Sequence, residues 1–337
     1  MGVDLGDLIK AEELDLNSLA GKKIAVDAFN TIYQFLSIIR QHDGTPLMDS
    51  RGKITSHLSG IFYRNMRLME IGVLPCYVFD GKPPQLKADT LKKRKATKEK
   101  AQREWTAAKD RGDMEGARKY AQATSKLTED MLNECKELLD ALGLPWVQSP
   151  GEGEAQAAHL CKERDVFAAA SQDFDSLLFG APKLVRNVNI TGKRKLPRRN
   201  VYIDVNPEML ELDKALAELK LSQEQLIEIG IMVGTDFNPG IKGIGPKKAL
   251  QHIRQKPISA WAKELDFGVD PLEVKKIFTE PEITKDYSLK WGAPNEEKLT
   301  EILHERHDFS KERITNALEK LGKAAHAKDQ KSLADFF

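Results

Sequence analysis

The chain has 337 residues, of which 41% are hydrophobic and 31% charged, and its formal net charge is +1. This composition is typical of a globular protein with two or three lobes, and it excludes collagen, low-complexity disorder and a disulfide-stapled mini-protein. The three cysteines are far apart in the sequence, so we expect reduced, buried thiols and no zinc site. The chain carries no long apolar run and no secretory signal, so we expect no membrane partner.

Strand-like apolar runs alternate with helical patterns along the chain. Residues 23–27 and 76–80 are short β-rich runs that each end in an aspartate, and residues 166–170 form a third run. The helical patterns lie between and after these runs, at 56–70, 86–143 and 154–158. Such alternation predicts an α/β fold with a mostly parallel central sheet flanked by helices.

Basic residues gather in three blocks that the near-neutral net charge conceals. Residues 82–103 carry nine basic residues against two acids. Residues 176–203 carry seven basic residues and residues 237–263 carry six, without any acid. One such block would indicate a solvated surface, but three separate blocks predict a polyanionic partner that is contacted at several places.

Seven carboxylates stand at the ends of predicted elements. Four follow strand-like runs, two open a helix and one follows an apolar helix: Asp27, Asp80, Asp173, Asp175, Glu152, Glu154 and Asp236. Because ligand sites of parallel sheets lie outside the carboxyl ends of the strands, we expect these side chains to converge. Each acid alone is ordinary capping or turn chemistry, but carboxylates this close stay ionised only around cations. Hard oxygen ligands favour Mg²⁺ or Mn²⁺.

This pattern predicts metal-assisted phosphodiester hydrolysis. Two divalent ions about 4 Å apart activate the attacking water and stabilise the leaving oxygen. The sequence contains no Ser/His/Asp, Cys/His, P-loop or Rossmann pattern that would compete with this interpretation. The alternative from another class is a non-catalytic scaffold for DNA junctions and a clamp, although a pure binder would gain affinity by losing acids that face phosphate.

Basic and aromatic residues near the acids are candidates for substrate contacts. Lys87 and Arg94 are seven residues apart and share one helix face, so both are candidates to meet a phosphate; the alternative is a solvated basic helix. Arg40 and Arg64 are candidates either for phosphate contacts or for surface salt bridges. Tyr33 is a candidate either to stack on a base or to pack against the sheet.

Five runs resemble the flap endonuclease family of structure-specific 5′ nucleases, archaeal type. They are residues 25–28, 78–84, 151–157, 171–178 and 234–236. The resemblance covers essentially the whole chain and implies a 5′ flap endonuclease with 5′ exonuclease activity that cuts where single strand meets duplex. It implies roles in DNA replication and repair, namely Okazaki fragment processing and long-patch base excision repair. The alternatives are a sister nuclease that cuts bubbles or four-way junctions, and RNA-directed cleavage.

The resemblance also assigns roles to residues. The carboxylates that match the first of two Mg²⁺ ions, for which Mn²⁺ substitutes, are Asp27, Asp80, Glu152 and Glu154. Those that match the second ion are Asp173, Asp175 and Asp236, with Glu154 near both ions. Lys87 and Arg94 match the catalytic basic pair on a helical arch that the 5′ flap passes through or under. Tyr33 matches the aromatic residue on which the base beside the cut stacks.

The segment 240–249 is predicted to form a tight glycine hairpin that opens a helix. Its N–H groups and lysines suit a duplex phosphate backbone without reading the base sequence. It resembles the family's helix-hairpin-helix element, here 235–256, where K⁺ commonly bridges to phosphate; a plain packing joint between helices is the alternative. The candidate DNA-binding residues are Gly234, Lys242, Gly243, Gly245, Lys247 and Lys248.

The end of the chain carries an unusual apolar face. Leu333, Phe336 and Phe337 fall on one face of a helical turn, which a protein in water would normally hide. Together with Gln330 they resemble the docking motif for the sliding clamp, proliferating cell nuclear antigen. The alternative is a tail that folds back onto its own core.

The resemblance divides the chain into overlapping parts. These are an N-terminal nuclease half at 1–98, a helical arch at 82–130, an internal nuclease half at 116–258, a C-terminal helical packing region at 259–328 and a docking tail at 329–337. It implies a monomer that works at the nucleoid in the cytoplasm of an archaeal cell, or in the nucleus of a eukaryotic cell.

Overall fold

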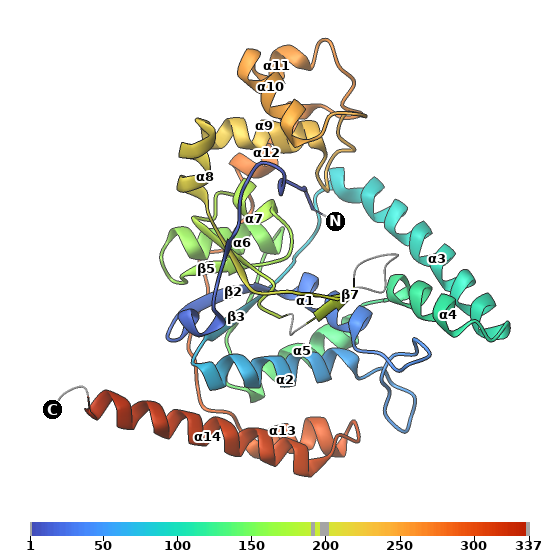
Figure 1. Ribbon diagram of the computed structural model, residues 1–337, viewed down its shortest axis with the longest axis vertical. Helices are drawn as coiled ribbons and strands as arrows, with labels where there is room; N and C mark the ends of the chain where they lie inside the picture. The colour runs from blue at the N-terminus through green and yellow to red at the C-terminus, as the bar shows by residue number, and fades with distance from the viewer. Residues whose placement is uncertain (1, 190–192, 196–201, 335–337) are drawn as a thin grey trace.

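A twisted sheet forms the centre of the molecule and carries helices on both faces (Figure 1). The computed structural model describes residues 2–189, 193–195 and 202–334. In this part of the chain one sheet has seven strands: β1 Glu12–Glu13, β2 Lys23–Asp27, β3 Leu74–Phe79, β4 Trp146–Gln148, β5 Ala168–Ala170, β6 Lys183–Arg186 and β9 Glu208–Glu211. Strands β7 Lys193–Lys195 and β8 Tyr202–Asp204 pair separately.

The strand order is β1-β9-β6-β5-β2-β3-β4. Strands β6, β5, β2, β3 and β4 run parallel to one another. Strand β9 pairs antiparallel with β6, and β1 pairs antiparallel with β9. The predicted α/β fold with a mostly parallel sheet is therefore confirmed. Along β2, Ala25 packs into the apolar cluster of one face while Ile24 and Val26 pack into that of the other, as the alternation of side chains in a strand requires.

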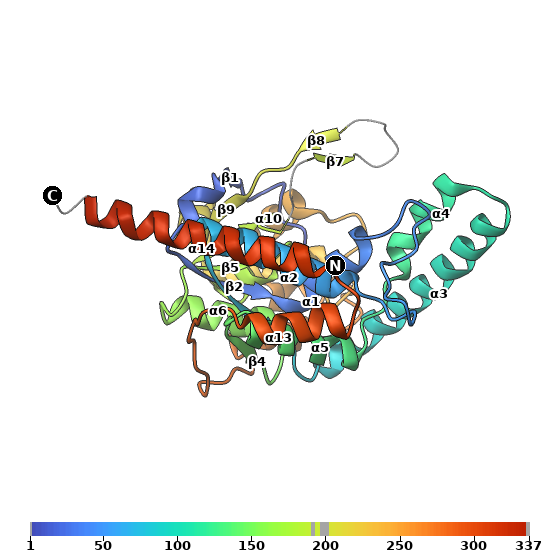
Figure 2. The same cartoon turned by 90° about the horizontal axis from the view of Figure 1, so that it is seen from below.

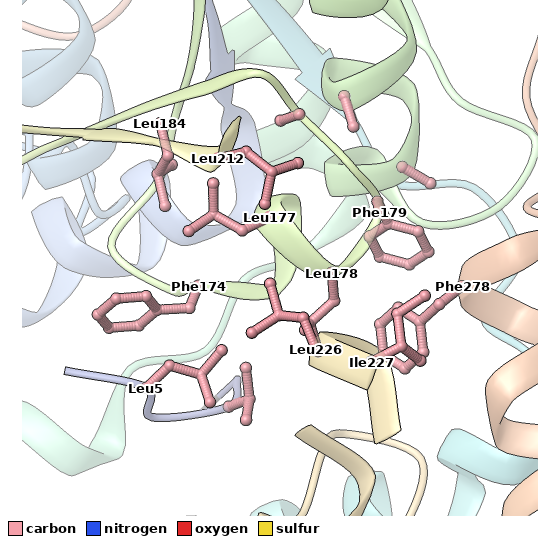
Figure 3. Close-up of a cluster of buried hydrophobic side chains, with 14 of the residues drawn as sticks. Leu5, Phe174, Leu177, Leu178, Phe179, Leu184, Leu212, Leu226, Ile227 and Phe278 are labelled. Atoms are coloured by element: carbon pink, nitrogen blue, oxygen red, sulfur yellow. The ribbon is translucent and has the colours of Figure 1, made fainter. Parts of the chain in front are cut away.

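One face of the sheet is covered by helices from the middle of the chain. These are α6 Gly153–Lys162, α7 Asp175–Leu178, α8 Leu212–Leu219, α9 Gln223–Val233, α10 Pro246–Gln255, α11 Ile258–Trp261 and α12 Pro271–Thr279. Figure 3 shows Leu178 of α7 pointing toward Leu226 of α9, and Leu177 lying on the other side of α7, near Leu212. Phe179 lies beside Phe278 of α12. This packing fixes Asp173 in the loop before α7 and Asp175 at the first position of α7.

The other face is covered by helices from the first half of the chain and from its C-terminal part. These are α1 Ala28–Ile38, α2 Ser56–Ile71, α5 Glu129–Ala141, α13 Glu296–Thr300, the π-helix η4 Glu301–Glu305 and α14 Lys311–Ala334, with the short 3₁₀ helix η1 Leu16–Leu19 at its edge. The first part of α14 packs on α2, and its second part extends beyond the body of the molecule in both views (Figures 1 and 2). No helix in the described ranges is long and apolar enough to cross a lipid bilayer.

A pair of helices projects from the body between β3 and α5. It comprises η2 Gln85–Lys87, α3 Ala88–Asp110, α4 Met114–Ala121 and η3 Gln122–Thr124. The chain reverses at Gly112, whose φ of +70° favours glycine, and Asp113 then caps α4 by accepting the N–H of Gly116 at 2.8 Å. Of α3 only Ala101 and Ala108 are buried, so this helix is largely held away from the core (Figures 1 and 2).

Some residues singled out in the sequence fall outside the described part of the chain. They are Arg198 and Arg199 of the second basic block, and Phe336 and Phe337 of the predicted docking motif. The backbone of Gln330 and Leu333 belongs to α14, which runs on as one helix from residue 311 to residue 334.

Candidate active site

Strand ends deliver four of the seven carboxylates to one edge of the sheet. Asp27 is the last residue of β2, Asp80 follows β3, and Asp173 and Asp175 follow β5. Strands β3, β2 and β5 are adjacent and parallel, so their carboxyl ends lie side by side. The side chains interact across this edge: Asp80 and Asp173 both act on the charge of Asp27.

Helix α6 adds Glu152, the residue that precedes its first turn, and Glu154 from that turn. The N–H of Gly153 donates to Oδ1 of Asp80 at 2.6 Å, which joins the start of this helix to the end of β3. A Cβ atom at position 153 would lie 2.5 Å from the same oxygen, so a side chain there would push the Asp80 carboxylate out of this position. Glu152 and Asp80 thereby come to lie in one electrostatic cluster.

Two polar side chains that the sequence did not single out as site residues tie the carboxylates together. The hydroxyl of Ser171 lies 3.3 Å from Oδ2 of Asp27 and 3.1 Å from Oε1 of Glu154, and it donates to one of them at a time. The amide of Asn30, in the first turn of α1, donates to Oδ2 of Asp173 at 3.0 Å. Both residues lie within three or four positions of a predicted ligand, which is the only signal in the sequence that points to them.

Asp236 reaches the cluster from the end of α9 and meets both predicted cations. The guanidinium of Arg94 donates to Oδ1 of Asp236 at 2.5 Å. The ammonium of Lys87 lies 3.4 Å from Oδ2 of Asp236 and donates to Oε2 of Glu152 at 2.5 Å. Lys87 of η2 and Arg94 of α3 thus point to the same side, as predicted, and this side meets the acids.

Burial makes these carboxylates costly to ionise. It raises the pKa of Asp27 to about 8, with Asp80 adding to the rise, and it raises the pKa of Asp175 to about 7. Burial is also the first cause of the raised pKa of Asp80, Glu152 and Glu154. Burial of Lys87 opposes its charge, but Glu152 and the acids beside it raise its pKa above the usual value. The cluster therefore favours added positive charge.

The donor set suits hard divalent cations, because it consists of carboxylate oxygens close to one another. As the side chains lie, the described residues include no group of three or more His, Cys, Asp or Glu that could hold a metal ion. Lys87 and Arg94 lie among the acids in this arrangement and partly neutralise them. A metal ion would bind the same oxygens only after these cations shift.

The remaining predicted DNA contacts lie around this cluster with different partners. Lys98 of α3 lies over the ring of Tyr33, with its Nζ 4.3 Å from the ring centroid and 3.3 Å from the hydroxyl. Arg40 donates to the carbonyls of Leu36 and Gly44 and to Ser125, so its guanidinium serves the fold. These contacts favour an internal role for Arg40 over a phosphate contact.

Arg64 lies on α2 and is half-buried. Burial and the neighbouring Arg67 lower its pKa. The structure therefore places Arg64 in a partly dry setting on the face of the sheet that α14 covers.

The predicted glycine hairpin joins α9 to α10. Gly234, Gly240 and Gly243 have φ values of +112°, +70° and +83°, which favour glycine at each position. Gly245 precedes the first turn of α10. The lysines of this segment are exposed, and they are Lys242, Lys247 and Lys248. The segment thus presents cations and the start of a helix to solvent.

The chain is similar to known nucleases over its whole length. Residues 1–101 match the XPG N-terminal domain, and residues 143–236 match the XPG I-region. Flap endonuclease 1 of Thermococcus onnurineus strain NA1 is 53% identical over all of this chain and 99% of its own length. The solved structure of flap endonuclease-1 from Methanococcus jannaschii is 40% identical, with a TM-score of 0.77 over 97% of this chain and 100% of that one.

The catalytic core of Rad2 in complex with DNA substrate is also similar in structure. It is 26% identical, with a TM-score of 0.72 over 95% of this chain and 100% of its own. Identity above one half to flap endonuclease 1 over the full length, together with both XPG regions, decides the family. This chain belongs to the flap endonuclease 1 family.

Proposed function

We propose that the seven carboxylates hold two Mg²⁺ ions, for which Mn²⁺ substitutes, in the active site of this 5′ flap endonuclease. The enzyme is a DNA hydrolase, and nucleases of its family generally use divalent metals. The observation that carries the proposal is the convergence of buried acids from three strand ends and two helices. Burial raises the pKa of Asp27 to about 8 and that of Asp175 to about 7, so nearby cations would favour the ionised form of both carboxylates at neutral pH.

The carboxylates of the site fall into two groups, one for each metal ion. Asp27, Asp80, Glu152 and Glu154 form the first group, and Asp173, Asp175 and Asp236 form the second. Bound Mg²⁺ would supply an activated water and stabilisation of the leaving oxygen. The protein's own part is to fix the oxygens: Gly153 holds Asp80, Asn30 holds Asp173, and Ser171 lies between Asp27 and Glu154.

Lys87 and Arg94 supply the positive charge that the scissile phosphate meets. Both lie at the base of the projecting helices, and both contact acids of the site. When a phosphate approaches, these side chains exchange a carboxylate partner for a phosphate oxygen, which stabilises charge that develops in the transition state. Catalysis then depends on their position rather than on proton transfer.

Three parts of the enzyme contact branched DNA in this proposal. The projecting pair α3 and α4 forms the arch that receives the 5′ flap, within residues 82–130. The hairpin at 235–256, with its exposed lysines, binds the duplex backbone, and this element would hold a K⁺ ion that adds positive charge at the phosphates. The ring of Tyr33 takes the base beside the cut.

The chain divides into the parts that its sequence suggested: nuclease halves at 1–98 and 116–258, a packing region at 259–328 and a tail at 329–337. The tail docks on a sliding clamp, proliferating cell nuclear antigen, through Gln330, Leu333, Phe336 and Phe337. The enzyme acts as a monomer at the DNA of the cell, which in an archaeal cell is the nucleoid in the cytoplasm. Its work there is Okazaki fragment processing and long-patch base excision repair, with 5′ exonuclease action beside flap cutting.

End-labelled DNA tests this function directly. A 5′-flap duplex is compared with plain duplex, single strand and a four-way junction, each with Mg²⁺ and with EDTA. We expect cutting that needs Mg²⁺ and is concentrated at the flap junction. Tight flap binding without cutting under any divalent ion would favour a scaffold, and preference for the four-way junction would favour a sister nuclease.

A further inference from the structure

The first residues of the chain lie against the active-site loop. Val3, Leu5 and Ile9 are buried, with exposed fractions of 2%, 0% and 4%. Figure 3 shows Leu5 on this N-terminal segment below Phe174, which stands between two predicted metal ligands in the chain. The segment 2–9 is therefore anchored in the core immediately beside Asp173 and Asp175.

The backbone of this segment holds one carboxylate. The N–H of Val3 donates to Oδ1 of Asp175 at 2.7 Å, across 172 positions of the sequence. Asp175 is only 4% exposed, so this hydrogen bond is made in a dry setting where its loss is costly. Among the causes that act on the pKa of Asp175, this bond is the one that most opposes the effect of burial.

Gly2 leaves no space for a side chain. A Cβ atom at this position would lie 2.4 Å from Oδ2 of Asp175, 2.7 Å from its Cγ and 2.8 Å from Cβ of Asp173. Contacts below 3 Å force a shift, and Cβ of Asp173 cannot rotate away as the tip of a flexible side chain would. Any side chain at position 2 would therefore displace Asp175, Asp173 or the segment itself.

We propose that Gly2 is a positioning residue of the second carboxylate group: by lacking a side chain, it lets the N-terminal segment lie against Asp173 and Asp175 and hold Asp175 through the Val3 N–H. This inference rests on the proposed function, because it assigns Asp173 and Asp175 to a divalent ion. The Val3 N–H holds Oδ1 of Asp175, and the absence of a side chain at Gly2 leaves Oδ2 of Asp175 uncrowded. Groups that hold a metal ligand in place set the affinity of the metal.

Gly6 offers a matched control in the same segment. A Cβ atom there would meet only Oδ1 of Asp4 at 3.3 Å and the ring edge of Phe174 at 3.7 Å. Gly2→Ala and Gly6→Ala therefore add the same methyl group four residues apart, and only the first reaches Asp173 and Asp175. Thermal unfolding of both variants measures whether the fold survives. We expect the midpoint of Gly6→Ala near that of the wild type and the midpoint of Gly2→Ala somewhat lower, because only the methyl group at position 2 displaces Asp175, Asp173 or the segment.

The test uses Mn²⁺ binding to the full-length protein, followed by electron paramagnetic resonance, beside flap cleavage over a range of Mg²⁺. We expect two Mn²⁺ ions on the wild type and on Gly6→Ala, and one of them bound about tenfold more weakly by Gly2→Ala. The Mg²⁺ concentration for half-maximal cleavage should rise by a similar factor in Gly2→Ala. Excess Mg²⁺ should restore kcat, and KM for the DNA should not change.

Two outcomes overturn the inference. One is a Gly2→Ala variant that binds Mn²⁺ and responds to Mg²⁺ as the wild type does. The other is a loss of kcat in Gly2→Ala that no Mg²⁺ concentration restores, which would indicate general damage to the fold. A wild type that cuts flaps but binds no Mn²⁺ would refute the metal assignment and the inference together, whereas the first outcome leaves the proposed function intact.

Discussion

The Nζ atom of Lys87 donates to Oε2 of Glu152 at a distance of 2.5 Å. The lysine is 8% exposed, and its ammonium also lies 3.4 Å from Oδ2 of Asp236. A buried cation between two acids stabilises their charge, and burial of the pair makes the removal of either partner costly. We therefore expect the same cation to meet a phosphate that approaches these acids.

Lys87→Ala should slow the chemical step by about a hundredfold and weaken flap binding much less, because its charge acts on the transition state. Single-turnover rates and separately measured affinities distinguish the two effects. Lys92→Ala is the matched control: its side chain is 81% exposed and pairs with Asp89 on the solvent side of α3. Equal losses in rate and affinity for Lys87→Ala would contradict a role in the chemical step.

Asp173→Ala should leave flap binding largely intact and reduce cleavage by roughly a thousandfold or more, because it removes an oxygen ligand of the second ion. The measurement is cleavage of a labelled 5′ flap beside binding of the same DNA in a gel shift. Asp213→Ala provides the control, since Asp213 is an exposed acid in the first turn of α8. A variant at Asp173 that cuts at the wild-type rate would remove this residue from the metal site.

The positions of Asp27 and Asp80 at one edge of the sheet could be predicted from the sequence, because they depend only on where strands end. Each follows an apolar run, adjacent parallel strands end at one edge, and the structure has β2 and β3 side by side in parallel. The position of Glu152 at a helix start could be predicted because Pro150 and Gly151 break helices, and the structure begins α6 at Gly153. These inferences needed only periodicity and element ends.

The groups that hold the carboxylates could not be predicted in the same way. The Val3 N–H bonds Asp175 across 172 positions, and no pattern in a single sequence records such a backbone contact. A buried network under the loop before α2 was missed for the same reason: His57 donates to or accepts from Glu134 at 2.9 Å, and His307 meets Asp49 at 3.2 Å. Polar contacts between residues far apart in the sequence leave no periodic pattern, so only the tertiary structure shows them.

The metal-free protein should become less stable as pH rises through neutrality. Burial raises the pKa of Asp27 from 3.8 to about 8, so between these values the folded state holds a proton that the unfolded state has lost. This contribution of Asp27 is fully present below about pH 4 and is lost as pH rises toward 8, by roughly 1 kcal/mol or more. Thermal unfolding in EDTA from pH 5 to pH 8 measures this slope.

Added Mg²⁺ should reverse that loss. A divalent ion favours the ionised carboxylates of the folded state, so the unfolding temperature should rise more with Mg²⁺ at pH 8 than at pH 5. Asp173→Ala serves as the control, because it removes a ligand while leaving Asp27 in place. An equal effect of Mg²⁺ at both pH values would show that its stabilisation does not come from these acids.

Deletion of residues 330–337 should leave cleavage of free flap DNA unchanged and remove stimulation by a sliding clamp. The deletion begins near the end of α14, in the part that extends beyond the body in Figures 1 and 2, so the core should be unaffected. Cleavage rates with and without clamp, beside direct binding of the clamp, test this. Phe336→Ala with Phe337→Ala should match the deletion, and clamp binding that survives both changes would refute the docking motif.

Tyr33 should contribute through its ring and not through its hydroxyl. Lys98 now lies over that ring, 4.3 Å from its centroid, so a base that stacks there must displace the ammonium, which is then free to meet a flap phosphate. Tyr33→Phe should therefore keep flap cleavage within about twofold of the wild type, whereas Tyr33→Ala should lose about tenfold and cut at less uniform positions. Lys98→Ala uncovers the ring and removes one phosphate contact, so its cleavage should depend less on salt concentration than that of the wild type. Equal loss in Tyr33→Phe and Tyr33→Ala, mapped at nucleotide resolution, would assign the effect to the hydroxyl and its contact with Lys98 instead.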